Sequence, residues 1–70
     1  MIFTQKANFY KLNDDSTITV KVGDKYYRCK ARFDILLKFN DKTQGEEFDG
    51  KYGLAYMRGQ GLVLQLVEVL

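Results

Sequence analysis

The sequence predicts an all-β protein, a small antiparallel barrel of five to six strands. Apolar and polar residues alternate over most of the chain, which is the periodicity of half-buried strands. Short clusters of glycine, asparagine, aspartate and serine interrupt this alternation and mark turns. The chain contains no proline, so any stretch can donate backbone hydrogen bonds to a ladder. Closure into a barrel is expected because it removes the exposed edges that a small flat sheet would leave.

The length of 70 residues fits one small domain that covers residues 1–70. SH3-like and OB-like barrels are the natural architectures at this size, and these names carry no function. The alternative is a β-sheet with one short helix between Ala31 and Asn40. A domain this small is marginally stable and depends on a well-packed core or on a partner chain.

The clearest local prediction is a hairpin over residues 17–30. Residues 17–22, TITVKV, are β-branched and alternating, and Gly23-Asp24 follows them. A glycine that begins a two-residue loop suits a type II′ turn, which fixes the register of both strands. The inner pairs are then Val22 with Lys25, Val20 with Tyr27 and Ile18 with Cys29, and the outer pairs are Lys21 with Tyr26, Thr19 with Arg28 and Thr17 with Lys30.

The stretch from Tyr26 to Asn40 alternates for longer than an ordinary strand does. We expect it to bend or break between Ala31 and Asp34. A helix over its second half would place Phe33, Leu36 and Leu37 on one side but would leave Ile35 and Phe39 off that stripe. Period two fits better, so the second half is predicted to be strand.

The remaining strands are expected at both ends of the chain. Residues 2–12 alternate loosely, with a kink near Ala7, and residues 40–50 are predicted to be an exposed loop. Residues 52–58 and 62–70 flank a second hairpin turn at Gly59-Gln60-Gly61, with Met57 near Leu62. The last strand is apolar on both faces, which indicates a central position. The predicted core comprises Ile18, Val20, Cys29, Phe33, Ile35, Leu37, Leu64 and Leu66.

Catalytic and metal chemistry find little support in the sequence, so the chain is predicted not to be an enzyme. It has no histidine, and its one cysteine, Cys29, falls on the apolar parity. Histidine and paired cysteines are also the usual zinc ligands, so no metal and no cofactor are expected. The adjacent acidic pairs, Asp14-Asp15 and Glu46-Glu47, lack the ligand spacing of a calcium loop.

No stretch approaches the roughly 20 apolar residues of a membrane span, and residues 1–10 lack the features of a signal peptide. A lone cysteine together with these absences indicates the cytoplasm. We therefore expect that the protein does not contact a membrane.

Cations gather in the first half of the chain and on one face of the predicted hairpin. Up to Arg32 the chain contains seven Lys and Arg residues and three Asp residues. Beyond Arg32 it contains four Lys and Arg residues and six Asp and Glu residues. Cations neutralise phosphates, and an aromatic ring offers a stacking surface to a base. The face predicts a non-enzymatic module that binds single-stranded nucleic acid or an acidic protein. The predicted site residues are Lys21, Tyr26, Arg28, Lys30 and Arg32 on this face, together with Lys25 at the hairpin tip.

The alternative interpretation is that these cations have no binding role and form a solvated outer face that keeps the domain soluble. The second functional hypothesis is a protein-protein interaction or inhibitor module. It rests on Leu36, which breaks the charged parity, and on the apolar C-terminal strand with Tyr52 and Tyr56 nearby. A homodimer through that strand or Leu36 is the corresponding expectation.

Overall fold

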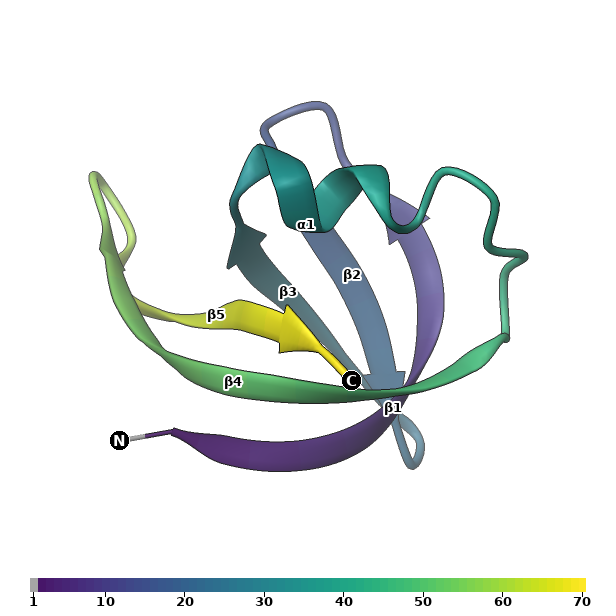
Figure 1. The fold of residues 1–70 in the computed structure, drawn as a ribbon. Coiled ribbons are helices and arrows are strands. Elements are labelled where there is room, and N and C mark those ends of the chain that lie inside the picture. Colours follow the sequence, from purple (N-terminus) through teal and green to yellow (C-terminus); the bar gives the residue numbers. More distant parts are fainter. Residues whose placement is uncertain (1) are drawn as a thin grey trace.

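The computed structural model describes residues 2–70 and shows a closed barrel of five strands with one short helix. The elements are β1 (Phe3–Leu12), β2 (Thr17–Val22), β3 (Lys25–Ala31), α1 (Phe33–Leu37), β4 (Glu47–Met57) and β5 (Gly61–Val69). The strand order around the barrel is β1-β2-β3-β5-β4, and β4 pairs back with β1 (Figure 1). The predicted small barrel is confirmed.

Four of the strand pairs are antiparallel, as predicted, and one is parallel, so the barrel is mixed. β3 and β5 run parallel and pair through three residues each, Cys29–Ala31 with Leu64–Leu66. The parallel pair arises because α1 and the following loop carry the chain to the other side of the barrel before β4 begins. Of the two expected architectures, this is the OB-like one, a five-stranded Greek-key barrel.

The first hairpin has the predicted register at every pair from Thr17 with Lys30 to Val22 with Lys25. Gly23 has a φ of 64°, which a residue with a side chain rarely adopts, so this glycine is needed at the first turn position. The turn therefore sets which side chains of β2 and β3 share a face.

The second half of the long alternating stretch is helical, so the prediction of strand there was wrong. β3 ends at Ala31, inside the expected break, and α1 begins at Phe33. The helical alternative also placed the wrong residues, Phe33, Leu36 and Leu37, on the apolar side of the helix. Ile35 and Phe39, four residues apart, are buried, whereas Phe33 is 73% exposed and Leu37 is 48% exposed. A spacing of four satisfies both the strand and the helix periods, so alternation could not distinguish them.

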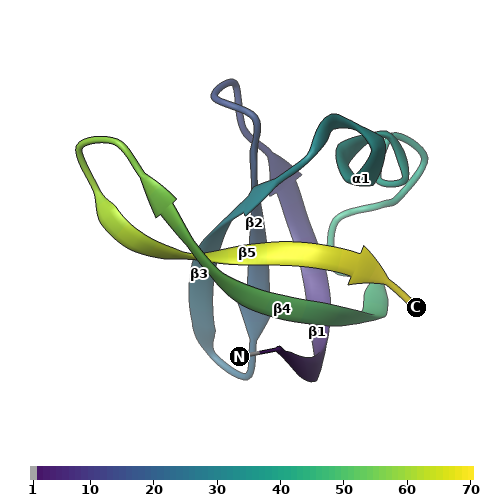
Figure 2. The ribbon, with the colours of Figure 1, turned by 60° about the vertical axis from the view of Figure 1, so that its left-hand side comes forward.

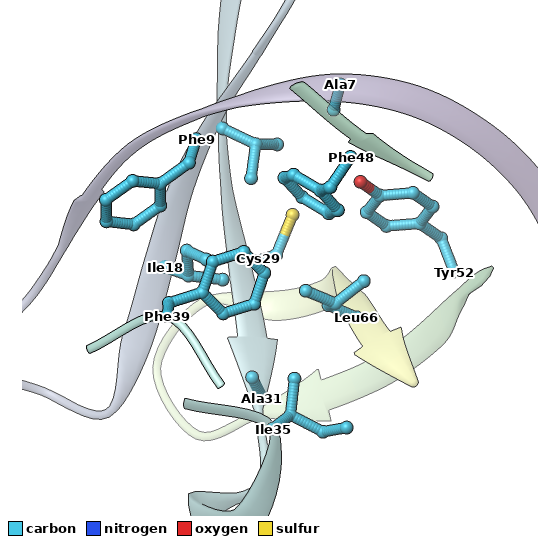
Figure 3. Packing of buried hydrophobic residues seen from close by; sticks show 11 residues of the cluster. Ala7, Phe9, Ile18, Cys29, Ala31, Ile35, Phe39, Phe48, Tyr52 and Leu66 are labelled. Carbon is cyan, nitrogen blue, oxygen red and sulfur yellow. The ribbon is translucent and has the colours of Figure 1, made fainter. Parts of the chain in front are cut away.

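The helix covers one end of the barrel, as both ribbon views show (Figure 2). Phe39, just after the helix, stacks on Phe9 with ring centroids 5.4 Å apart and meets Phe48 edge-on at 4.9 Å. These three rings close that end (Figure 3). Because α1 has only five residues and a bilayer crossing needs about 20, no helix within residues 2–70 can cross a membrane.

The core lies inside the barrel and holds most of the predicted residues. Ile18, Val20, Cys29, Ile35 and Leu66 are buried as predicted, and Leu64 is half-buried against them. Phe33 and Leu37 are not core, because α1 turns them to solvent. The sequence did not identify the following further core residues: Ala7, Phe9, Ala31, Phe39, Phe48 and Tyr52.

The second half of the chain differs in detail from the expectation. β4 begins at Glu47, so Phe48 is a buried strand residue and not part of the 40–50 loop. In the second hairpin Met57 pairs with Gly61, one residue away from the predicted partner. β5 lies between β3 and β4, but every strand of a closed barrel has two neighbours, and β5 is not covered on both faces as expected, since Leu66 is its only buried residue. Its remaining apolar side chains are partly or fully exposed.

Candidate nucleic-acid interface

Four of the six predicted site residues lie together on the outer face of β2 and β3. Lys21 pairs with Tyr26, and Arg28 and Lys30 follow on alternate residues of β3. Their neighbours Val20, Cys29 and Ala31 point into the core, so the pleat directs the four side chains outward. We call Lys21, Tyr26, Arg28 and Lys30 the basic face.

Lys25 and Arg32 stand apart from the basic face. Lys25 has the opposite parity, pairs with Val22 and lies at the hairpin tip. Arg32 comes after the end of β3, where it precedes α1 and forms an exposed ion pair with Asp34 at 3.1 Å. The prediction that Arg32 continues the basic face was therefore wrong, since the chain leaves the sheet at that residue.

Tyr26 is held on the basic face by two neighbours. The Tyr10 ring of β1 meets it edge-on with centroids 4.9 Å apart, and the Lys21 ammonium lies 5.5 Å from the Tyr26 centroid. A cation above an aromatic face is attracted by the ring quadrupole. Tyr26 nevertheless remains 55% exposed, so much of the ring is free for a further contact.

Sequence reasoning missed Tyr10 and Lys11 as parts of this surface. The β1–β2 register shifts between Phe9 and Lys11, so Tyr10 is the extra residue of a bulge. A bulge turns neighbouring side chains away from simple alternation. Lys11 then pairs with Thr19 and faces outward. The only signal in the sequence was Tyr10 and Lys11 standing side by side in a loosely alternating strand.

Arg28 is committed to a polar network and is not a free cation. Its guanidinium lies 2.8 Å from Asp15, and its Nε donates a hydrogen bond to Thr17 Oγ1 at 3.1 Å. Thr17 is fully buried beneath this cluster, and its hydroxyl donates to Asp15 and accepts from Asn13. The Thr17 hydrogen bond and, less strongly, the Arg28 charge lower the pKa of Asp15. The network anchors the β1–β2 loop beside the basic face.

Two lysines elsewhere on the barrel form ion pairs, whereas Lys38 and Lys42 near α1 have none among the described residues. On the β1–β4 wall, Lys6 lies 3.6 Å from Glu47 and 3.4 Å from Asp49. Lys51 of β4 lies 3.6 Å from Glu68 of β5. Within residues 2–70, by contrast, no carboxylate lies within ion-pair distance of the lysines on and beside the basic face, namely Lys11, Lys21, Lys25 and Lys30.

The arrangement offers electrostatic attraction and a stacking surface. Cys29 is buried in the core, and burial raises the pKa of its thiol to about 11. Burial also raises the pKa of Tyr52, whose hydroxyl has no hydrogen-bond partner. Residues 2–70 contain no group of three His, Cys, Asp or Glu side chains placed to hold a metal ion.

No protein-family model, curated protein or solved structure matches this chain.

Proposed function

We propose that this protein is a non-enzymatic binding module whose basic face binds single-stranded nucleic acid. The observation that carries the proposal is the exposed Tyr26 ring, which Tyr10 and Lys21 hold among lysines that lack carboxylate partners. An immobilised ring loses little entropy when a base stacks on it, and the lysines supply the attraction to phosphates.

The barrel architecture supports this choice of ligand. OB-like barrels bind oligonucleotides across the face of β2 and β3, beside the β1–β2 and β4–β5 loops. Here the basic face occupies those strands, and the Arg28–Asp15 ion pair fixes the β1–β2 loop at its border. A fold hosts many functions, so the side chains and not the architecture carry the proposal. A reducing compartment such as the cytoplasm suits the unpaired Cys29.

Titration of a fluorescently labelled single-stranded oligonucleotide at low salt, read by anisotropy, tests the proposal. Four lysines that contact phosphates give a slope of log K against log salt of about −3 on single strands. Lys21→Ala with Lys30→Ala should reduce that slope by about 1.4. A control pair, Lys38→Ala with Lys42→Ala, removes two lysines near α1 and should leave the slope unchanged.

Substitution of Tyr26 separates stacking from charge. Tyr26→Ala should weaken binding by about 1–3 kcal/mol without changing the salt slope, whereas Tyr26→Phe should bind like the parent. If the oligonucleotide does not bind at low salt, the nucleic-acid proposal is lost. An acidic protein would then be the remaining partner for this face, and capture of proteins with the parent but not with the Lys21/Lys30 double variant would identify it.

A further inference from the structure

The hairpin of β4 and β5 extends beyond the barrel wall as a two-stranded arm. We define the arm as residues 54–64, which include the loop from Arg58 to Gln60; it projects away from the other strands in both ribbon views (Figures 1 and 2). β4 pairs with β1 only as far as Tyr52, and β5 pairs with β3 only from Leu64 onward. Among the described residues, the outer edges of both arm strands therefore have no ladder partner, except at Leu64, which pairs with Cys29.

The inward face of the barrel continues along this arm and becomes exposed. Tyr52 and Leu66 form a pair that is buried in the core, and the next two pairs on the same parity are Leu54 with Leu64 and Tyr56 with Leu62. Leu54 is 58% exposed, Tyr56 68% and Leu62 70%. The inner face of the arm thus has the apolar composition of the core but is exposed to solvent outside the barrel.

A small apolar cavity opens beside the arm at the end of the barrel away from α1. It has a volume of about 200 Å³, and its lining includes Phe3, Val22, Tyr27 and Leu64. Phe3 and Tyr27 are themselves partly exposed at 41% and 38%. Leu64 belongs both to the cavity wall and to the arm, so the cavity and the inner face of the arm form one continuous apolar surface.

Charge is almost absent from the β4–β5 part of this surface. Residues 52–67 contain one charged side chain, Arg58 at the tip of the arm, whereas 29% of the whole chain is charged. Strand edges that must stay unpaired are usually protected by lysine, proline or inward-pointing charge. Depletion of charge with enrichment of aromatic residues marks the buried centre of an interface.

The extent of the surface indicates a protein partner. The exposed parts of Leu54, Tyr56, Leu62, Phe3 and Tyr27 amount to on the order of 500 Å², at the upper end for the largest patch on a monomer. A standard interface buries about 800 Å² per partner, of which a little over half is apolar. The surface therefore matches one side of such an interface, whereas a small ligand in the cavity would leave Tyr56 and Leu62 uncovered.

We propose that the partner is a second copy of this chain, packed arm against arm about a two-fold axis. The inner faces of two arms, formed by Leu54, Tyr56, Leu62 and Leu64, can meet without burying an unpaired charge, and the aromatic and leucine side chains of each arm are then available to fill the cavity mouth of the other. Interfaces between identical chains are more apolar than those between transient partners. Two-fold dimers are also the commonest soluble assemblies. The dimer leaves the basic face free, because that face lies on the outside of β2 and β3.

Light scattering coupled to size exclusion tests the proposal on the full chain. The parent should have twice the 8.1 kDa mass of one chain. Tyr56→Lys with Leu62→Lys should give single chains, because the two-fold axis would bring like charges together. The control, Phe33→Lys with Leu37→Lys, replaces side chains that are similarly exposed on α1 and should remain a dimer.

Thermal unfolding of the parent gives a second readout that needs no variant. The melting temperature of a dimer rises with protein concentration. A single-chain mass for the parent at every concentration, or a melting temperature independent of concentration, would overturn the proposal. Assembly into open-ended oligomers would also overturn the proposal. So would the same molecular mass for the Tyr56/Leu62 and the Phe33/Leu37 double variants. Lys21→Ala with Lys30→Ala should not alter the dimer, so failure of nucleic-acid binding leaves this test unaffected.

Discussion

The guanidinium of Arg28 lies 2.8 Å from the carboxylate of Asp15, which ties the β1–β2 loop to the middle of β3. Both side chains also bond to the buried Thr17 hydroxyl, so the loop, the start of β2 and β3 share one hydrogen-bonded cluster. The pair is half exposed, so it contributes modestly to stability. Its larger effect is on the shape of the surface beside Lys21 and Tyr26.

The Asp15 carboxylate should make stability depend on pH in the acid range. Its pKa in the folded protein lies below the ordinary 3.8, chiefly through the Thr17 hydrogen bond. A lowered pKa gives stability that is present above the unfolded value and is lost as the pH falls through the folded value. The parent should therefore melt above Asp15→Asn near pH 6, and the difference should begin to shrink near pH 3.8 and vanish only once the pH is below the lowered folded pKa. The control Asp14→Asn should show no such convergence.

The Cys29 thiol should be inert in the folded protein. It is fully buried, and burial raises its pKa to about 11. A thiol reagent at neutral pH should react only in step with unfolding, and denaturant should release the full reaction. The raised pKa also means that stability falls as the pH rises from about 9 to about 11. Cys29→Ala should lose stability but show a flatter pH profile over that interval. Rapid labelling of the native parent would contradict the buried position.

A side chain at Gly50 of β4 should crowd the side chains of Leu66 and Tyr52. A Cβ at Gly50 would lie 2.8 Å from the Leu66 Cδ1 and 3.1 Å from the Tyr52 ring. Gly50→Ala should therefore destabilise the barrel by about 1–3 kcal/mol through overpacking. Leu66→Val removes the closest atom, so in that background the cost of Gly50→Ala should be smaller. Urea unfolding of the four variants measures this coupling, and strict additivity would contradict it.

The first hairpin could be predicted from sequence because its register depends on a local turn. Gly23 with positive φ fixes the pairs of β2 and β3, and with them the shared face of Lys21, Tyr26 and Arg28. The second hairpin contains Gly59 and Gly61, both at positive φ, so its sequence allows more than one loop length. The observed loop spans Arg58 to Gln60, which shifts the register by one residue. Because of that shift Tyr56 pairs with Leu62, so the two side chains share one face of the arm.

The surroundings of the basic face could not be predicted, because they depend on contacts distant in sequence. Tyr10 of β1 meets Tyr26 of β3 across the barrel surface, and Asp15 reaches Arg28 through the conformation of the β1–β2 loop. Alternation identifies faces but not the residues at which a strand leaves its sheet. That limit also explains Arg32, which keeps the parity of the basic face but lies beyond the end of β3.

Phe33 begins α1 and Phe39 follows its end, and truncation of the two should have very different effects on stability. Phe39 is 1% exposed and contacts Phe9 and Phe48, so Phe39→Ala opens a cavity at the end of the barrel. The expected loss is about 3–5 kcal/mol, enough to unfold much of a marginal domain. Phe33 is 73% exposed, so Phe33→Ala should change stability by no more than about 0.5 kcal/mol.

Chemical unfolding followed by circular dichroism measures both losses, and Phe39→Leu provides a graded control that retains part of the buried volume. Its loss should fall between that of Phe39→Ala and the parent. The contrast also discriminates between the two conformations of residues 33–39. In a continuous strand Phe33 and Phe39 share one face, so comparable losses would place both rings in the core and contradict the helix. Only a helix that turns Ile35 and Phe39 inward and leaves Phe33 outside gives a large loss at one position and almost none at the other.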